Sequence, residues 1–323
     1  MERLFGQSRA VEQFSTAWAG RRLHHAWLLA GPSGVGKAMF ARMASTRVLA
    51  DAAGPVSDEP DLGTPTDHPV ARLLSAGSHP DFRWLRRLEK PTGGLARNIS
   101  VDQVRSLGDL LSVTPSLSSW RAIVIDSADH LEASAANALL KMLEEPPPST
   151  LFFLVSHAPG RLLPTIRSRC RRLDFARLDN DSMKSVLSDP ANGLSSADIE
   201  RLIGLAQGSP GRAMSMAKLD LAPLEEDARR IMRDGDADNI RRSKLASSLS
   251  TKAAADRYSA FLALVPALIA REAITASGEQ RGRALTAYAR ARETTALAPR
   301  LSLDPGATVF QLGGILASVA LKR

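Results

Sequence analysis

The feature that most constrains this chain is a glycine-rich loop placed directly between an apolar strand and a helix. We expect the strand over residues 26–30, and the loop consists of Gly31, Pro32, Ser33, Gly34, Val35, Gly36, Lys37 and Ala38. Glycines at this spacing let backbone N–H groups turn inward around phosphates, and the start of the helix adds a favourable dipole. Lys37 adds a positive charge for the β- and γ-phosphates. The sequence therefore predicts a nucleotide-binding loop, with a tight turn that holds no ligand as the alternative.

The loop departs from the full motif at the residue after its lysine. The motif has Ser or Thr there, because that hydroxyl ligates Mg²⁺. This chain has Ala38, which offers no oxygen. We expect the loop to keep its affinity for the phosphates of ATP or ADP, with Mg²⁺ bound weakly or not at all.

A second phosphate-site motif lies at the end of another apolar strand. The segment 121–125 is followed by Asp126 and Ser127. A carboxylate at that point can hold Mg²⁺ through water beside the loop, and in hydrolysing enzymes the next residue is commonly Glu, which activates the attacking water. Ser127 is a poor base near neutral pH. We therefore interpret Asp126 as part of the nucleotide site and predict that hydrolysis is impaired, although Asp126 could also merely end a strand.

The hydrophobic pattern changes near residue 176. Before it, short β-type runs alternate with helical stretches, which is typical of a parallel sheet covered by helices. The expected strands are 26–30, 82–88, 122–125, 151–155 and 172–175. After it, only helices are expected, at 181–188, 195–207, 211–219, 223–234, 239–249, 253–275, 279–297 and 306–322. The predicted fold class is α/β followed by all-α, with residues 51–80 as an irregular insertion.

Composition narrows the class of protein further. Lys and Arg exceed Asp and Glu by 42 − 34 = 8, a charge that suits a polyanionic partner but also serves solubility alone. The single Cys170 excludes an internal disulfide and a cysteine-rich zinc site. The longest apolar run, 260–270, is too short to span a membrane and contains Pro266, and the first residues lack a secretory core. A cytoplasmic location is expected.

Five segments in a fixed order carry a resemblance to a known family. They are the loop, the Asp126 strand, Asn137-Ala-Leu-Leu-Lys-Met-Leu-Glu-Glu-Pro-Pro147, Ser168-Arg169-Cys170 and Gly208-Ser-Pro-Gly-Arg212. Together they resemble AAA+ subunits of bacterial DNA polymerase III clamp loaders, and segments 23–31 and 161–171 narrow the resemblance to delta-prime subunits. The family implies a five-stranded P-loop sheet with helices on both faces in 1–176, a small helical lid in 177–221 and a helical collar for oligomerisation in 222–323.

The resemblance also implies roles for three further residues. Arg169 matches the arginine finger, which reaches the ATP of a neighbouring subunit and presents a planar, fixed cation to developing phosphate charge. Ser156 matches the polar sensor at the end of a strand, and Arg212 matches a lid-domain arginine that points toward the nucleotide. Many family members bind zinc through four cysteines after the first helix. Because 51–80 contains no cysteine, no zinc is expected here.

The function implied by the resemblance is help in loading the sliding clamp onto primed DNA. The implied partners are gamma/tau and delta subunits, the clamp and primer–template DNA contacted through its backbone, in a hetero-pentamer. Loss of the metal-binding hydroxyl and of the water-activating Glu predicts no intrinsic ATPase activity. The resemblance implies a subunit without polymerase activity of its own in a DNA-directed DNA polymerase holoenzyme. A hydrolysing ATPase of the gamma/tau type is the alternative; a nucleotide-kinase-type phosphotransferase fits less well because of the long helical second half.

Overall fold

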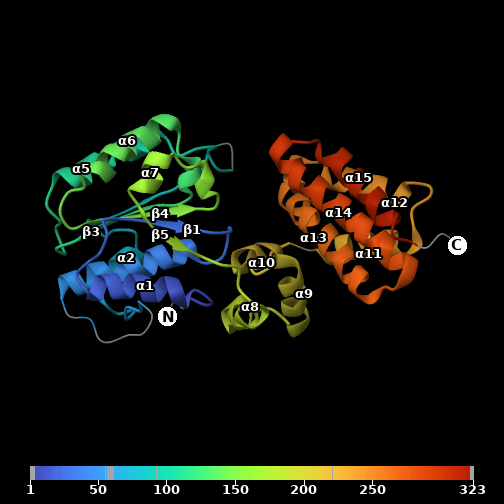
Figure 1. The fold of residues 1–323 in the computed structure, drawn as a ribbon, viewed down its shortest axis with the longest axis horizontal. Helices are drawn as coiled ribbons and strands as arrows, with labels where there is room; N and C mark the ends of the chain where they lie inside the picture. The colour runs from blue at the N-terminus through green and yellow to red at the C-terminus, as the bar shows by residue number, and fades with distance from the viewer. Residues whose placement is uncertain (1–3, 55, 57–61, 92–93, 220, 321–323) are drawn as a thin grey trace. The chain divides into compact units, whose positions relative to one another are not determined.

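The computed structural model describes residues 4–54, 56, 62–91, 94–219 and 221–320, and these divide into two compact units (Figure 1). The first unit runs to Val186 and includes Gly208–Gly211, and the second comprises Leu187–Gln207 and the chain from Arg212 onward. The division into three domains at residues 176 and 221 stays a prediction.

The first unit is built on one five-stranded sheet in which every neighbouring pair is parallel. Its order is β2-β3-β4-β1-β5, so β1 lies inside the sheet between β4 and β5. The strands are β1 (Ala26–Ala30), β2 (Phe82–Leu85), β3 (Arg121–Ile125), β4 (Thr150–Ser156) and β5 (Arg171–Asp174). All five predicted strands are confirmed. β2 ends at Leu85, three residues before the predicted end, because its partner β3 ends at Ile125 opposite it.

Helices cover both faces of this sheet, as Figure 1 shows for α1 and α2 on one side and α5, α6 and α7 on the other. The helices of this unit are α1 (Ser8–Ala19), α2 (Lys37–Ala53), α3 (Pro69–Ser75), α4 (Val101–Arg105), α5 (Leu107–Ser112), α6 (Ala133–Glu144), α7 (Pro164–Ser168) and α8 (Asn180–Leu187). The last residue of α8, Leu187, is the first residue of the second unit. Because side chains alternate along a strand, β1, β3 and β4 supply apolar groups to both faces. The predicted α/β class is thereby confirmed.

The two faces have different cores. Under α4–α7 the core is mainly aliphatic and includes Leu28, Ile123, Phe152, Leu139 and Ile166. Under α1 and α2 it is an aromatic cluster of Phe14, Trp27, Phe40, Phe153 and Phe175. Both cores bury the strands that carry the loop and the predicted site residues, so they fix the backbone at those positions.

The described part of the segment 51–80 is more regular than predicted, while residues 55 and 57–61 of the predicted insertion lie outside the described residues. α2 continues to Ala53, and α3 forms from residue 69, where Pro69 stands in the first turn and the His68 ring accepts a hydrogen bond from the Val70 N–H at 3.2 Å. Val70 and Leu74 of α3 pack on α2. Proline and a capping side chain are ordinary helix-start signals, but a helix this short has too weak a period to stand out beside Gly and Pro.

The second unit is entirely helical in the part of the chain that the structure describes. Its helices are α9 (Ser196–Ala206), most of α10 (Pro210–Ala217), α11 (Ala222–Asp234), α12 (Ile240–Leu249), α13 (Ala255–Thr275), α14 (Gly278–Leu301) and α15 (Pro305–Ala317). The all-α second half is confirmed. The stretch Lys252–Thr275 is long and apolar enough to cross a membrane, yet 56% of its most apolar window is buried, and α13 packs against α14 and α15 as a core helix.

Candidate nucleotide site

The glycine-rich loop joins the end of β1 to the start of α2, as predicted. Three of its glycines have backbone angles that side chains rarely adopt, with φ of 154° at Gly31, 74° at Gly34 and 104° at Gly36. Space is also limiting at Gly31, where an added Cβ would lie 2.2 Å from the Phe175 carbonyl oxygen. The loop therefore needs glycine both for its turn and for the close approach of the chain after β5.

Two remote segments brace the loop. The Gly211 N–H donates to the Gly34 carbonyl at 2.9 Å, and the Ser209 hydroxyl donates to the Ser33 carbonyl at 2.9 Å. The buried Gln7 side chain donates to the carbonyls of Val35 and Ala176 at 3.3 and 2.8 Å. Neither Gln7 nor Ser209 was predicted to contact the loop. Ser209 lies in the Gly208-Ser-Pro-Gly211 segment, which stands out in the sequence. A single glutamine such as Gln7 belongs to no recognisable pattern.

Lys37 is the first residue of α2 and is only 2% exposed. Its ammonium donates hydrogen bonds back to the loop, to the carbonyls of Gly31 at 2.6 Å and of Pro32. Burial lowers the pKa of Lys37 to about 8, although the negative charges of Asp129 and Asp126 oppose that shift. The ammonium therefore lies inside the loop, where a phosphate could take the place of the carbonyls as its partner.

Asp126 follows β3 directly, and its backbone N–H donates to the Leu85 carbonyl at 2.8 Å. Burial raises the pKa of the Asp126 carboxyl, while nearby His157 and a hydrogen bond from Trp84 oppose the rise. Asp126 and Lys37 are close enough for each charge to shift the pKa of the other. The carboxylate that the sequence places beside the loop therefore lies near enough to Lys37 to interact with it electrostatically.

Ser156, the predicted sensor, ends β4 beside Ala30, the last residue before the loop. Its hydroxyl donates to a carboxylate oxygen of Asp129 at 2.6 Å, and that carboxylate also accepts from the N–H groups of His157 and Ala158 at 2.5 and 3.3 Å. Asp129 therefore ties the chain after β3 to the end of β4. Asp129 was not predicted to be part of the site.

Ser127 occupies the position where a hydrolysing enzyme would have its water-activating Glu. It has a left-handed backbone with φ of 67°, and its hydroxyl lies 3.3 Å from Nε2 of His157. Burial and the Lys37 charge lower the pKa of His157, whose Nδ1 is buried with no hydrogen-bond partner among the described residues. The side chains around the loop thus offer one cation, Lys37, and two partly buried carboxylates, Asp126 and Asp129.

The donor set fits a nucleotide better than it fits a magnesium ion. The loop glycines and Lys37 provide the N–H groups and charge that phosphates require. Ala38 presents a methyl group where the motif has a metal-binding hydroxyl.

Arg169 lies at the opposite edge of the sheet from the loop. β1 and β5 are parallel and pair Trp27 with Arg171 and Ala30 with Asp174, so Arg169 lies just before the start of β5, while the loop follows the end of β1. The intervening strand length is about 16 Å. The Arg169 side chain is 34% exposed, pairs with Glu144 at 2.7 Å and donates to the Thr165 carbonyl at 2.9 Å.

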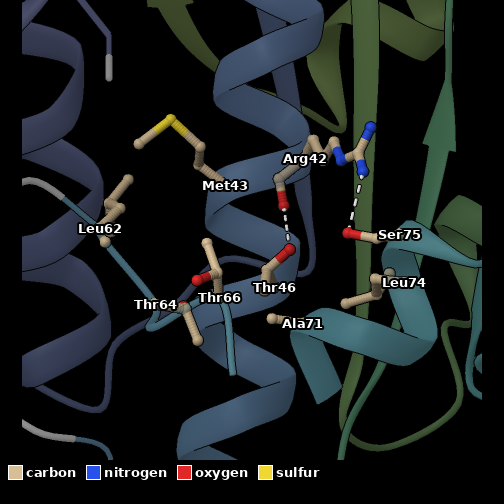
Figure 2. A pocket seen from close by; sticks show the side chains of 10 residues that line it. Arg42, Met43, Thr46, Leu62, Thr64, Thr66, Ala71, Leu74 and Ser75 are labelled. Atoms are coloured by element: carbon tan, nitrogen blue, oxygen red, sulfur yellow. Dashed lines mark hydrogen bonds between the residues drawn. The ribbon is translucent and has the colours of Figure 1, made fainter. Parts of the chain in front are cut away.

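Arg212 belongs to the second unit, and it directly follows Gly211, which hydrogen-bonds to the loop in the first. It lines a cavity of about 350 Å³ between α10 and α13, together with Lys218 and Asp256. Its predicted role stays a prediction. A cavity of about 330 Å³ in the first unit, between α2, α3 and residues 62–66, contains none of the predicted site residues (Figure 2). Arg42 and Ser75 meet there at 3.4 Å.

The arrangement defines a class of protein. A parallel sheet of order β5-β1-β4-β3-β2, with a phosphate loop after β1, an acid after β3 and a polar residue at the end of β4, is the P-loop architecture of AAA+ proteins. The family model described as "DNA polymerase III, delta subunit" matches residues 6–179. The chain belongs to that family, which confirms the resemblance found in the sequence.

Individual relatives agree with this assignment. The DNA polymerase III subunit delta' of Pseudomonas aeruginosa is 37% identical over 199 residues, which cover 59% of this chain and 55% of that protein. The subunit tau of Bacillus subtilis is 29% identical over 219 residues, covering 67% of this chain and 36% of that protein. The matched region thus spans about half or less of these relatives. The structure of a gamma subunit-related protein from Thermotoga maritima aligns with 94% of this chain and 98% of its own at 17% identity and a TM-score of 0.43.

Proposed function

We propose that this chain is a clamp-loader subunit of the delta-prime type that hydrolyses no ATP itself and donates Arg169 to the ATP site of a neighbouring subunit. In this role it helps to load the sliding clamp onto primed DNA. The observation that carries the proposal is the placement of Arg169 at the edge of the sheet opposite its own phosphate loop.

The distance between these edges favours action on another subunit. An extended arginine side chain reaches about 7 Å from its Cα, less than half of the roughly 16 Å of strand between the two edges. Arg169 therefore cannot serve the loop of its own chain. It is also half-exposed at the end of a short helix, so a phosphate on a docked neighbour could contact it.

The chain's own loop supports nucleotide binding without turnover. Its glycines, Lys37 and Asp126 are in place, so ATP or ADP could be held by the loop. Ala38 removes the hydroxyl that would hold Mg²⁺, and Ser127 replaces the carboxylate that would activate water. These two absences act on the same step, the attack of water on the γ-phosphate.

The proposed partners follow from the relatives' names. We propose that the chain assembles in the cytoplasm with gamma/tau-type and delta-type subunits as a hetero-pentamer, and that the assembled loader binds the sliding clamp and primer–template DNA. Contacts with the DNA would be made to its backbone and would weaken with salt. The helical second half, including α13–α15, would form the collar that joins the subunits.

The test of the finger is the ATPase rate of the reconstituted loader with clamp and primed DNA. Arg169→Ala should lower the stimulated rate by about tenfold or more, because a finger stabilises transition-state charge directly. Arg167→Ala, which removes an exposed arginine two residues away, is the matched control and should leave the rate near that of the wild type. Equal rates for the two variants would refute the finger assignment.

The alternative of a hydrolysing gamma/tau-type ATPase is favoured by the intact Lys37 and by the likeness to the Bacillus subtilis tau subunit. It predicts substantial ATP turnover by the purified chain alone, whereas the proposal predicts none above background. In the assembled loader, Lys37→Ala should have a smaller effect than Arg169→Ala. The reverse order would show that this chain's own site drives loading.

A further inference from the structure

We propose that Glu144 is a positioning residue for Arg169, holding the guanidinium in the orientation from which it meets a neighbour's phosphate. This inference rests on the proposed function, because it assigns a role to the residue that holds the finger. It comes from a feature that the family motifs did not explain: Glu144, the first acid of the Glu144-Glu145-Pro146-Pro147 segment, forms an ion pair with Arg169 at 2.7 Å.

The guanidinium is anchored at two points within its own chain. One terminal nitrogen, Nη2, contacts Oε1 of Glu144 at 2.7 Å, and the other, Nη1, donates to the Thr165 carbonyl at 2.9 Å. Two anchors on a planar group fix both its position and the direction of its plane. Its Nε–H and the remaining Nη hydrogens stay without a partner among the described residues, and these are the donors that a phosphate would need.

Both anchors stand on elements that are packed into one core. α6 ends at Glu144 and buries Leu139 and Leu143 in the aliphatic cluster, and α7, which carries Thr165, buries Ile166 in the same cluster. The last turn of α6 is held further by the His25 ring, whose Nε2 lies 3.1 Å from the Leu143 carbonyl oxygen. The Glu144 carboxylate and the Thr165 carbonyl therefore form a rigid binding site for the Arg169 guanidinium, which we call the seat.

The seat holds Arg169 without hiding it. The Arg169 side chain is 34% exposed and that of Glu144 is 46% exposed, so an incoming phosphate can reach the guanidinium while the carboxylate still holds it. An exposed arginine must lose much of its rotamer freedom when it binds a phosphate. Because the seat already restricts the Arg169 rotamers before binding, less conformational entropy is lost when the phosphate binds. This is the general advantage of preorganisation.

The chain contains its own control for this idea. Glu145 is the next residue, carries the same charge and is exposed, but it forms no ion pair with any described residue. A variant at Glu145 therefore changes the charge of the segment as much as one at Glu144, without touching the seat. Glu144→Gln is a second control, because its amide oxygen can still accept the hydrogen bond from Nη2.

The experiment measures the ATPase rate of the reconstituted loader with clamp and primed DNA, for variants that melt within a few degrees of the wild type. Glu144→Ala should lower the maximal rate by about three- to fivefold and leave the half-saturating ATP concentration unchanged, because the finger acts in the transition state. The maximal rate of Glu144→Gln should stay within about twofold of the wild-type rate. The maximal rate of Glu145→Ala should equal the wild-type rate. In the Arg169→Ala background, Glu144→Ala should have no further effect.

Each other result overturns the inference in a recognisable way. A Glu144→Ala rate equal to that of Glu145→Ala shows that the seat does not matter, and a raised rate shows that Glu144 restrains the finger instead. A further loss in the Arg169→Ala background shows that Glu144 acts through some other group. If Arg169→Ala lowers the rate and Glu144→Ala does not, only this inference fails; if Arg169→Ala leaves the rate unchanged, the proposed function fails with it.

Discussion

The two edges of the parallel sheet hold their cations in different ways. At the edge where the strands end, Lys37 is 2% exposed and donates to two loop carbonyls, and the neighbouring carboxylate of Asp129 accepts three hydrogen bonds from β4 and the residues after it. At the edge where the strands begin, Arg169 keeps 34% of its side-chain surface and is held by one ion pair and one carbonyl.

Under the proposed function, this difference separates the binding of a nucleotide at one edge from the action on a neighbour's nucleotide at the other. A buried site is held in place where its polar groups already have partners, as Lys37 and Asp129 do, and a ligand must replace those partners. A half-exposed cation on a fixed seat needs no such exchange before it meets a charge on another molecule. If the comparison is correct, substitutions at the first edge should mainly change stability, and substitutions at the second should mainly change the activity of the assembled loader.

The largest effect on stability is expected from Gly31→Ala. The added Cβ would meet the Phe175 carbonyl oxygen at 2.2 Å, and φ is 154° there, so both the loop and the chain after β5 must move. We expect a loss of about 3 kcal/mol or more in the free energy of unfolding, measured by urea denaturation. Gly160→Ala is the control, because nothing lies within 4 Å of its added Cβ. A Gly31→Ala variant as stable as that control would show that the first edge is not rigid.

The sequence predicted this edge well where the chemistry is local. The loop, the buried strands and Asp126 each have a signature within ten residues, and all of them are where the sequence analysis placed them. The braces come from far along the chain: Gln7 reaches Ala176, and Ser209 reaches Ser33. No periodicity or spacing links residues that far apart, because only the closed fold brings them together.

The same limit applies at the other edge. The Ser168-Arg169-Cys170 motif predicted a finger at Arg169 through resemblance, but the ion pair of Arg169 with Glu144 depends on how α6 and α7 pack on one core. The helix α3 was missed for a different reason, since its seven residues offer too little period beside the surrounding Gly and Pro. Local signals were thus sufficient for the strands and long helices, and insufficient for contacts between elements.

A moderate loss of stability is expected from Asp129→Asn. This variant tests whether the edge where the strands end depends on the Asp129 carboxylate. The variant removes the charge that accepts from the Ser156 hydroxyl and from the N–H groups of His157 and Ala158. Because hydrogen bonds to a charged group are the stronger kind, we expect a loss of about 2 kcal/mol in the free energy of unfolding. Asp109→Asn, at an exposed position on α5, should change it by less than about 0.5 kcal/mol. Equal losses would mean that Asp129 does not hold β4.

The smallest effect concerns the pH dependence that Lys37 confers. Burial lowers the pKa of Lys37 to about 8 in the folded chain, against an ordinary value of 10.5. Below pH 8 the lysine is charged in both states, and the folded state bears the cost of burying that charge. Between about pH 8 and 10.5 the folded state releases its proton first, so the unfolded state binds more protons and stability rises with pH.

Subtracting the Lys37→Met variant isolates this contribution, since all other titrating groups are common to both proteins. From pH 7 to pH 9 the wild type should gain about 1–2 kcal/mol in unfolding free energy relative to Lys37→Met. The same subtraction with Lys141→Met, an exposed position on α6, should show no such gain. A flat difference for Lys37→Met would mean that the ammonium is well solvated, and the contrast between a closed first edge and an open second edge would then be lost.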